Sequence, residues 1–251
     1  MKTNRWEARL AIGLLLAALA AYAVRWFVFS GPELQSEMLR FLVGDIAFLF
    51  VQVLLVTLVL DRLIRQRAQE ETRRKLNMVI GAFFSQTGKD LLGLIAGADA
   101  ELAEVRSELV PSYGWRAAEY ERARSHFRAH EPSIDLTTCD LERLRSMLAA
   151  ERPFLIGLLA NQALLEHATF TDALWAITHL GEELEARPAL DALEPADARH
   201  LALDLKRAYT QLGLEWLSYM QHLQTAYPFL FSLAVRSNPL DPDAHIAVAD
   251  E

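Results

Sequence analysis

Two long apolar stretches lie within the first sixty residues, and they constrain the fold more than any other feature. The first covers residues 10–29 and contains one charged residue, Arg25, while the second covers residues 39–60 and contains Arg40 at its start and Asp45 and Gln52 farther in. A helix rises about 1.5 Å per residue, so twenty residues span roughly 30 Å, the thickness of a bilayer core. The sequence therefore predicts a transmembrane helical hairpin over residues 1–60.

The charges that flank these stretches predict the orientation of the hairpin. Lys2, Arg5 and Arg9 precede the first stretch and a basic segment follows the second, while the connection 30–37 holds two acidic residues and no basic one. The positive-inside rule then places both termini in the cytoplasm, as in a multi-pass protein of the cytoplasmic (inner) membrane. A cleaved signal peptide is the alternative for the first stretch, but the stretch exceeds the usual apolar region of about 7 to 15 residues.

Two charged residues, Arg25 in the first stretch and Asp45 in the second, are predicted to face each other. In a hairpin that turns near residue 35, Arg25 lies level with Asp45, and an interhelical ion pair offsets much of the cost of burying either charge in lipid. Two alternatives remain open: Asp45 and Gln52 line an ion path in an oligomer, or they pair with another protein. A face of small residues would let another helix approach closely: Gly13, Ala17, Ala20 and Ala21.

Charge is distributed unevenly over the rest of the chain. Residues 61–75 form a predicted basic helical stalk that would contact anionic lipid headgroups through Arg62, Arg65, Arg67, Arg73, Arg74 and Lys75. The remaining residues are strongly acidic and bring the whole chain to a net charge of −8. No basic patch of useful size is left to neutralise phosphates, which argues against a nucleic-acid partner. One cysteine, Cys139, fits a reducing compartment.

Residues 76–236 predict an all-helical cytosolic domain, followed by a flexible acidic tail over 237–251. Apolar residues recur at steps of three and four along residues 76–98, which indicates a core helix, with an interfacial helix on the membrane as the alternative. Proline and capping residues divide the remainder into helices, with Thr137 and Asp140 capping one that ends near Ala150 and Pro153 opening the next. Thr169 with Asp172 is predicted to cap another, and Pro195 to open a long helix that reaches Ala226. The segment 228–236 is predicted to cap the core, with contact to the membrane surface as the alternative.

Two groups of residues have the composition of metal sites, and neither has a recognised motif. His126 and His130 form HxxxH on a predicted helix but lack an assured third ligand, so they are weak candidates in polar surroundings. A second group contains an ExxH spacing in reverse at His179 to Glu182 and an aspartate version at Asp197 to His200. Its members are Glu166, His167, His179, Glu182, Glu183, Asp197, His200 and Asp204. We interpret these residues as helix-end charges and surface histidines, and we expect no metal or other cofactor.

Motifs for catalysis are missing from the sequence. It contains no GxSxG, no P-loop and no GxGxxG, so an enzyme is not excluded but is the less favoured class. The segments "LDRLIRQRAQEETRRKLNMVIGAFFSQTGKDLL", "LLEHATFTDALWAITHLGEELEARP" and "YPFLFSLAVRSNP" resemble a family of prokaryotic two-span membrane proteins. That family has no assigned activity, so the resemblance implies the architecture alone.

Together these features predict a membrane-anchored helical interaction or scaffold protein without evident catalytic activity. Its expected partners are the lipid bilayer and either further copies of itself or other membrane protein subunits. An oligomeric ion channel that uses Asp45 and Gln52 is the first alternative, and a metal-binding helical-bundle enzyme is the second.

Overall fold

The computed structural model describes residues 5–28, 34–162, 164 and 167–247. In these residues the regular elements are helices, and an isolated antiparallel bridge joins Asp99 to Ile134. The predicted all-α class is thus confirmed for the described part of the chain. The chain divides into two compact units, residues 1–71 and residues 72–251.

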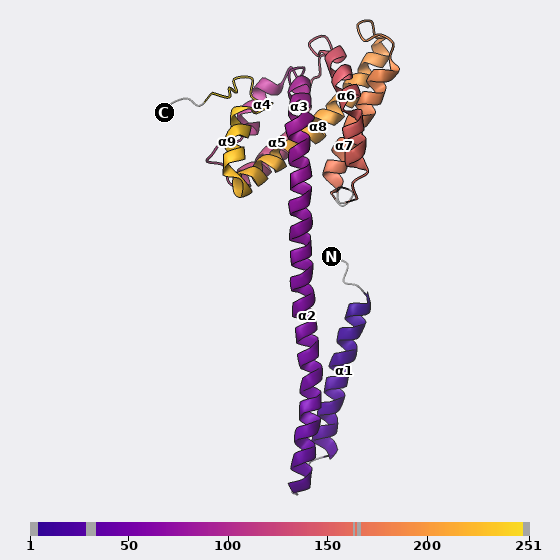
Figure 1. The fold of residues 1–251 in the computed structure, drawn as a ribbon, viewed down its shortest axis with the longest axis vertical. Coiled ribbons are helices and arrows are strands. Elements are labelled where there is room, and N and C mark those ends of the chain that lie inside the picture. Colours follow the sequence, from indigo (N-terminus) through magenta and orange to yellow (C-terminus); the bar gives the residue numbers. More distant parts are fainter. Residues whose placement is uncertain (1–4, 29–33, 163, 165–166, 248–251) are drawn as a thin grey trace. The chain divides into compact units, whose positions relative to one another are not determined.

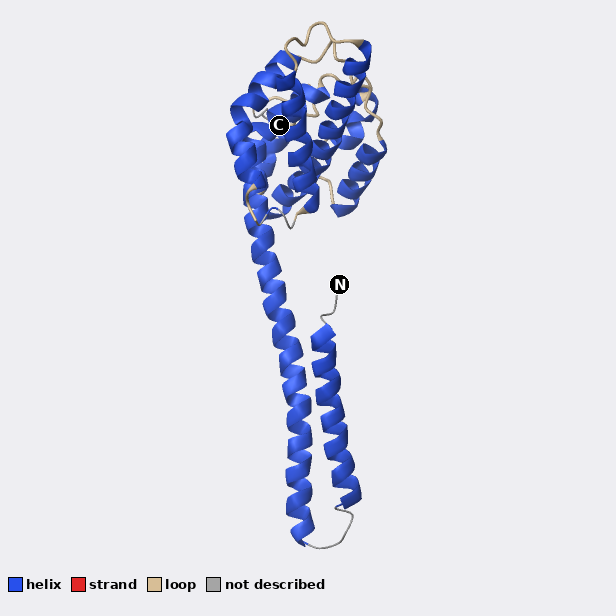
Figure 2. Ribbon diagram, turned by 90° about the vertical axis from the view of Figure 1, so that its right-hand side faces the viewer, coloured by secondary structure: helices blue, strands red, loops and turns tan. Residues whose placement is uncertain are grey.

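The first unit contains helix α1 (Arg5–Val28) and most of helix α2 (Leu34–Phe83), which run antiparallel and side by side within it (Figures 1 and 2). Neither helix contains a proline. Helix α2 therefore carries the second apolar stretch and the predicted stalk in one continuous run of 50 residues. The buried positions carry small residues: Ala18 is 4% exposed and Ala47 is 0% exposed. Small side chains let helices approach closely, while large apolar side chains face outward.

The predicted face of small residues on α1 is confirmed only in part. Ala17 and Ala21 are half-buried, whereas Gly13 and Ala20 are exposed, and a Cβ added at Gly13 would meet nothing within 4 Å. The predicted positions at steps of three and four therefore cover a wider arc of the helix than the part that is buried.

The chain enters the second unit through the end of α2, a π-helical turn η1 (Phe84–Gly88) and helix α3 (Lys89–Ala96). The π-helical turn places Gly88 against the ring of Phe83, where an added Cβ would lie 2.4 Å from Phe83 Cε1. The apolar residues predicted to form one stripe are buried or, for Leu94, half-buried: Leu76, Ile80, Phe83, Thr87, Leu91, Leu94 and Ala98. Residues 76–98 therefore belong to the core of this unit, as predicted.

Helix α8 is the central element of the second unit. Its 32 residues begin at Pro195 and end at Ala226, and they pack against α3 and three other helices, α5, α7 and α9, while α6 packs on the outer side of α7 (Figures 1 and 2). The helices around it are α4 (Leu102–Leu109), α5 (Ala117–Ala129), α6 (Leu141–Leu159), α7 (Ala168–Ala186) and α9 (Pro228–Arg236). The predicted bounds of α8 are confirmed. The physical reason is that proline favours the first turn of a helix, as Pro195 does here, while Pro228 cannot continue α8.

Helix α6 corrects one prediction. Pro153 lies inside this helix and does not open a new one. A proline in a helix interior costs about 3 kcal/mol, but Leu148, Leu155 and Leu158 on both sides of it are buried. Each buried leucine contributes roughly 2 kcal/mol, so burial of one continuous face outweighs the lost backbone hydrogen bond.

The helix caps also differ from the prediction in detail. Asp140 does cap α6, because its carboxylate accepts a hydrogen bond from the backbone N–H of Arg143 at 2.9 Å. Thr137 instead donates its hydroxyl to Asp135 at 2.7 Å. Helix α7 is capped by the imidazole of His167, which accepts from the N–H of Phe170, so the predicted cap at Thr169 is wrong.

Residues 238–240, directly after α9, lie against the core, so the predicted flexible tail does not begin at residue 237. Asn238 is 2% exposed and Leu240 is 0% exposed. The indole Nε1 of Trp216 donates to Asn238 Oδ1 at 3.0 Å, which holds this segment against α8. In helix α9 Phe231, at 2% exposed, lies in the core and Ala234 and Val235 pack against it, whereas Phe229 is 73% exposed.

Candidate metal centre

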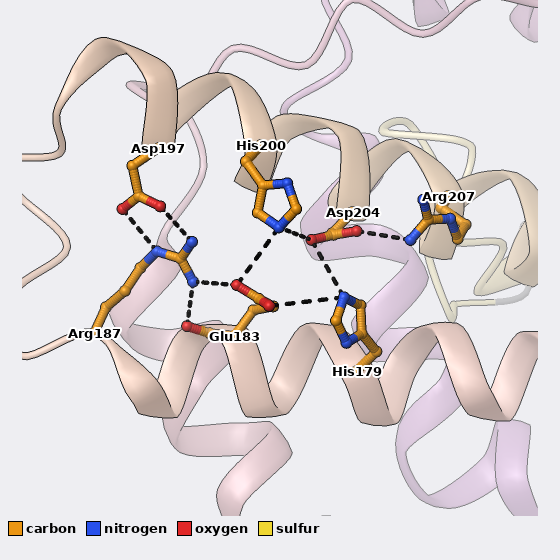
Figure 3. Close-up of polar contacts among 7 residues, drawn as sticks. All are labelled: His179, Glu183, Arg187, Asp197, His200, Asp204 and Arg207. Carbon is orange, nitrogen blue, oxygen red and sulfur yellow. Dashed lines mark hydrogen bonds and ion pairs between the residues drawn. The ribbon is translucent and has the colours of Figure 1, made fainter.

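Four ionisable side chains gather between α7 and α8 (Figure 3). His179 and Glu183 lie four residues apart on α7, and His200 and Asp204 lie four residues apart on α8. Residues at this spacing share one face of a helix. Because α7 and α8 pack against each other, the two faces meet, and one ligand atom from each residue lies within 4.8 Å of the other three.

The two imidazoles face the two carboxylates. His179 Nε2 lies 3.6 Å from Asp204 Oδ2 and 3.8 Å from Glu183 Oε1. His200 Nε2 lies 3.4 Å from Asp204 Oδ2 and 3.7 Å from Glu183 Oε2. These separations are longer than the usual 2.7–3.2 Å of a hydrogen bond, so the four groups surround a common point without bonding directly to each other.

Two arginines hold the two carboxylates in place. Arg187 donates to Glu183 Oε2 at 2.7 Å and makes two hydrogen bonds to Asp197, at 2.9 and 2.5 Å. Arg207 donates to Asp204 Oδ1 at 2.7 Å. The hydrogen bonds from Arg187 lower the pKa of Glu183 and of Asp197 below their usual values. Both arginines therefore orient the carboxylates, and Arg187 also favours the charged forms of Glu183 and Asp197.

Asp204 is the most deeply buried member of the group. Its side chain is 2% exposed, and its second oxygen, Oδ2, has no hydrogen-bond partner among the described residues. The two histidines are much more open, with side-chain exposures of 44% for His179 and 54% for His200. A shallow groove that includes Trp175, Gln211 and Arg207 runs beside His179, so solvent reaches the group from the imidazole side.

The sequence contains the residues of this group, but the spacings considered there are not the ones that converge. All four residues belong to the set recognised in the sequence, yet the spacings considered there joined His179 to Glu182 and Asp197 to His200. In the structure Glu182 lies 3.6 Å from Arg152, and Asp197 binds Arg187. The informative pattern is a histidine followed four residues later by a carboxylate, repeated on successive helices.

The other members of that set lie elsewhere. His167 caps α7, and Glu166 lies outside the described residues. The HxxxH candidates do not converge, because His126 contacts Glu108 whereas His130 Nε2 lies 2.7 Å from Asp99 Oδ2.

The predicted intramembrane ion pair cannot be followed, since the side chain of Arg25 lies outside the described residues. Its partner Asp45 is exposed on α2, as is Gln52. In the basic stalk, Arg65 pairs with Asp61, and the described side chains Arg62, Arg67, Arg74 and Lys75 are exposed. The side chain of Arg73 lies outside the described residues.

A further buried acid, Glu215, lies on α8 apart from the four-residue group, at 4% exposed. Burial raises the pKa of its carboxyl above the usual value of 4.5, while a hydrogen bond from Thr169 and the charges of His167 and Arg124 act in the opposite direction. A raised pKa favours folding in the protonated form, so this contribution is complete below about pH 4.5 and is lost as the pH rises.

We therefore expect Glu215→Gln to raise the melting temperature at pH 7 by about 2–4 °C. The gain should vanish near pH 4, because both proteins are then neutral at this position. Thermal unfolding at both pH values measures it, with Glu182→Gln, at an exposed carboxylate on α7, as the control. A Glu215→Gln protein that is less stable than the parent at pH 7 would show that the charged partners outweigh burial.

Comparison with known proteins gives matches over both units. Residues 72–236 match the family described as "Uncharacterized protein MJ1433, C-terminal helical domain", and residues 2–64 match the family described as "MJ1433, N-terminal helical domain". The chain is 33% identical to "Uncharacterized protein MJ1433" of Methanocaldococcus jannaschii over 251 residues, which is the full length of both proteins. The chain belongs to the MJ1433 family.

The family assignment agrees with one part of the resemblance noted in the sequence, namely that the related proteins form a family with no assigned activity. The descriptions of the MJ1433 family name helical domains and assign no activity, substrate or ligand. The boundary between the two matched domains, after residue 64 and before residue 72, lies close to the division of the structure at residue 71. No solved structure matches the chain.

Proposed function

We propose that this member of the MJ1433 family is a membrane-anchored interaction protein. In this proposal residues 1–60 insert into the cytoplasmic membrane as a two-helix anchor with both termini in the cytoplasm. The helical domain that follows binds other proteins or a second copy of the chain.

One observation carries the proposal, the uncovered apolar surface of α2. The helical run Gly44–Ala96 contains an 18-residue window with a mean hydropathy of 2.2, of which 6% is buried. Among the large apolar side chains of α2, Phe41, Leu55 and Ile64 are 64–65% exposed. Soluble monomers seldom expose contiguous apolar patches above a few hundred Å², so a lipid environment accounts for this surface.

Helix α1 supports the proposal that the anchor has two membrane-spanning helices. Its apolar stretch Ile12–Val24 is shorter than the window on α2, yet Ile12, Leu16 and Leu19 are 57–59% exposed. Each side chain of this size that is left in water costs roughly 2 kcal/mol relative to burial. Two apolar helices that expose their large residues and bury small ones have the pattern of helix pairs in lipid.

Alkaline carbonate extraction tests the anchor. We expect the full-length protein to stay with the membrane pellet after carbonate treatment and to enter solution only with detergent. Release by carbonate would overturn the anchor, because peripheral proteins leave the membrane under these conditions while spanning helices do not.

Orientation is tested with single cysteines in a Cys139→Ala background. The native thiol is a poor reporter, since it is buried and burial raises its pKa to about 11. Met78→Cys introduces a thiol at a position that is 70% exposed, and Ser36→Cys places one in the segment between the apolar stretches. We expect a membrane-impermeant maleimide to label Ser36→Cys in intact cells and Met78→Cys only after permeabilisation. The reverse pattern would contradict the proposed topology.

The interaction role has its own test. Light scattering of the protein in detergent, together with crosslinking in membranes before purification, measures self-association and bound partners. A strictly monomeric protein that yields no crosslinked species would overturn this part of the proposal and leave the anchor intact.

A further inference from the structure

We propose that His179, Glu183, His200 and Asp204 bind a divalent transition-metal ion of the zinc class. The ion would join α7 to α8. This inference is independent of the membrane anchor, because it rests on contacts within the helical domain.

The distances between the four residues fit a tetrahedral site. Zinc bonds to imidazole nitrogen at about 2.0–2.1 Å and to carboxylate oxygen at about 2.0–2.2 Å, so neighbouring ligand atoms in a tetrahedron lie about 3.3–3.5 Å apart. Asp204 Oδ2 lies 3.6 Å from His179 Nε2 and 3.4 Å from His200 Nε2, while Glu183 turns Oε1 to His179 at 3.8 Å and Oε2 to His200 at 3.7 Å. Small side-chain rotations close the remaining tenths of an ångström, while the same atoms are too far apart for good hydrogen bonds.

Asp204 provides an independent reason to place a cation here. A buried carboxylate oxygen without a partner is unfavourable, and such groups in folded proteins are satisfied by hydrogen bonds, water or ions. Asp204 Oδ2 is such an oxygen, and it faces both imidazole Nε2 atoms (Figure 3). A metal ion at the common point would bind the oxygen and both nitrogens at once.

The donor set indicates the class of metal. Two imidazoles with two carboxylates suit zinc and its transition-metal neighbours, whereas calcium and magnesium prefer all-oxygen sites. Arg187 and Arg207 each hold one carboxylate from outside, as second-shell groups do at metal centres. The two carboxylates carry the charge that matches a divalent ion, and the exposed imidazoles leave a path for it to enter.

Metal binding should therefore stabilise the contact between the two helices. At a free zinc concentration about one hundred times Kd, we expect the melting temperature to rise by about 5 to 10 °C. The experiment uses the full-length protein in detergent after treatment with a chelator. Zinc is added in isothermal titration and in thermal unfolding, and the visible absorption of Co²⁺ reports the coordination number.

The variants separate this site from other histidines. His179→Ala and His200→Ala remove side chains that are about half exposed, so the fold should survive, which far-UV circular dichroism checks. We expect one zinc per chain in the parent protein and a loss of affinity of about a hundredfold or more in either variant. Asp204→Asn, which keeps the shape of the side chain, should also weaken binding. His126→Ala is the matched control, because it removes a half-exposed imidazole that contacts one carboxylate on another helix.

The absence of zinc binding by the parent protein would overturn the proposal. So would zinc binding that survives the combined His179→Ala and His200→Ala substitutions, or zinc binding that is lost in His126→Ala. Stabilisation by magnesium or calcium equal to that by zinc would also contradict it, because the imidazoles would then have no role.

Discussion

Gly213→Ala is expected to lower the melting temperature of the helical domain by about 5 to 10 °C, although alanine favours helices over glycine by about 1 kcal/mol. The reason is the ring of Phe127, which lies where the new methyl group would be: a Cβ at Gly213 would be 2.1 Å from Phe127 Cε1 and 2.2 Å from Cζ. Extra atoms in a packed core typically cost about 1–3 kcal/mol. The cost here should be near the upper end, since the clash is with a rigid ring.

The ring cannot move aside easily. Phe127 is 1% exposed and packs edge-to-face on Tyr209, with ring centroids 5.2 Å apart. The contact brings α5 close to α8, so the glycine sets the distance between these helices.

Gly157→Ala on α6 is the matched control. Gly157 is exposed, and an added Cβ there would meet nothing within 4 Å. Its only expected effect is the gain in helix propensity, which should raise the melting temperature slightly. Thermal unfolding of both variants by far-UV circular dichroism measures the difference. Equal stabilisation by the two substitutions would show that the contact between Gly213 and Phe127 is not as close as the structure has it.

Trp216→Ala should produce the largest loss of stability. Trp216 is 2% exposed and packs edge-to-face on Phe84, with ring centroids 5.2 Å apart. Truncating a buried tryptophan costs about 3–5 kcal/mol, which corresponds to a fall in melting temperature of about 10 °C for a domain of this size. Because the indole also binds Asn238, we expect the segment around Asn238 and Leu240 to become sensitive to proteolysis.

Trp216→Phe separates the packing from the hydrogen bond. It keeps an aromatic ring near Phe84 but removes the Nε1–H donor to Asn238, so it should cost about 1–3 kcal/mol. The control is Trp175→Ala, which removes a tryptophan that is 59% exposed on α7 and should change the melting temperature little. If Trp216→Phe and Trp175→Ala have the same effect, the buried hydrogen bond contributes nothing measurable to the attachment of the C-terminal segment.

Several elements follow from local sequence alone. The apolar period of residues 76–98 places those residues in the core, and Pro195 with Pro228 sets the bounds of α8. These features are local, because a helix repeats every 3.6 residues and proline acts on its own turn. Sequence patterns fail where packing competes with a local signal, as at Pro153, where buried leucines on both sides keep α6 continuous.

The burial of Asn238 and Leu240 has no local signal either. The segment after residue 237 is polar and rich in proline, which is the composition of a mobile tail. Asn238 Oδ1 accepts hydrogen bonds from the backbone N–H of Leu240 and from the indole of Trp216, which lies on the distant helix α8.

Local sequence is enough to predict the helical class, the apolar stretches of the first sixty residues and the set of residues from which the candidate metal centre is drawn. Which of those residues meet depends on tertiary packing. His179 and Glu183 share a face of α7, and His200 and Asp204 share a face of α8, because of the helical period. The two faces converge only because α7 and α8 pack together, and that packing is fixed by the whole core around α8.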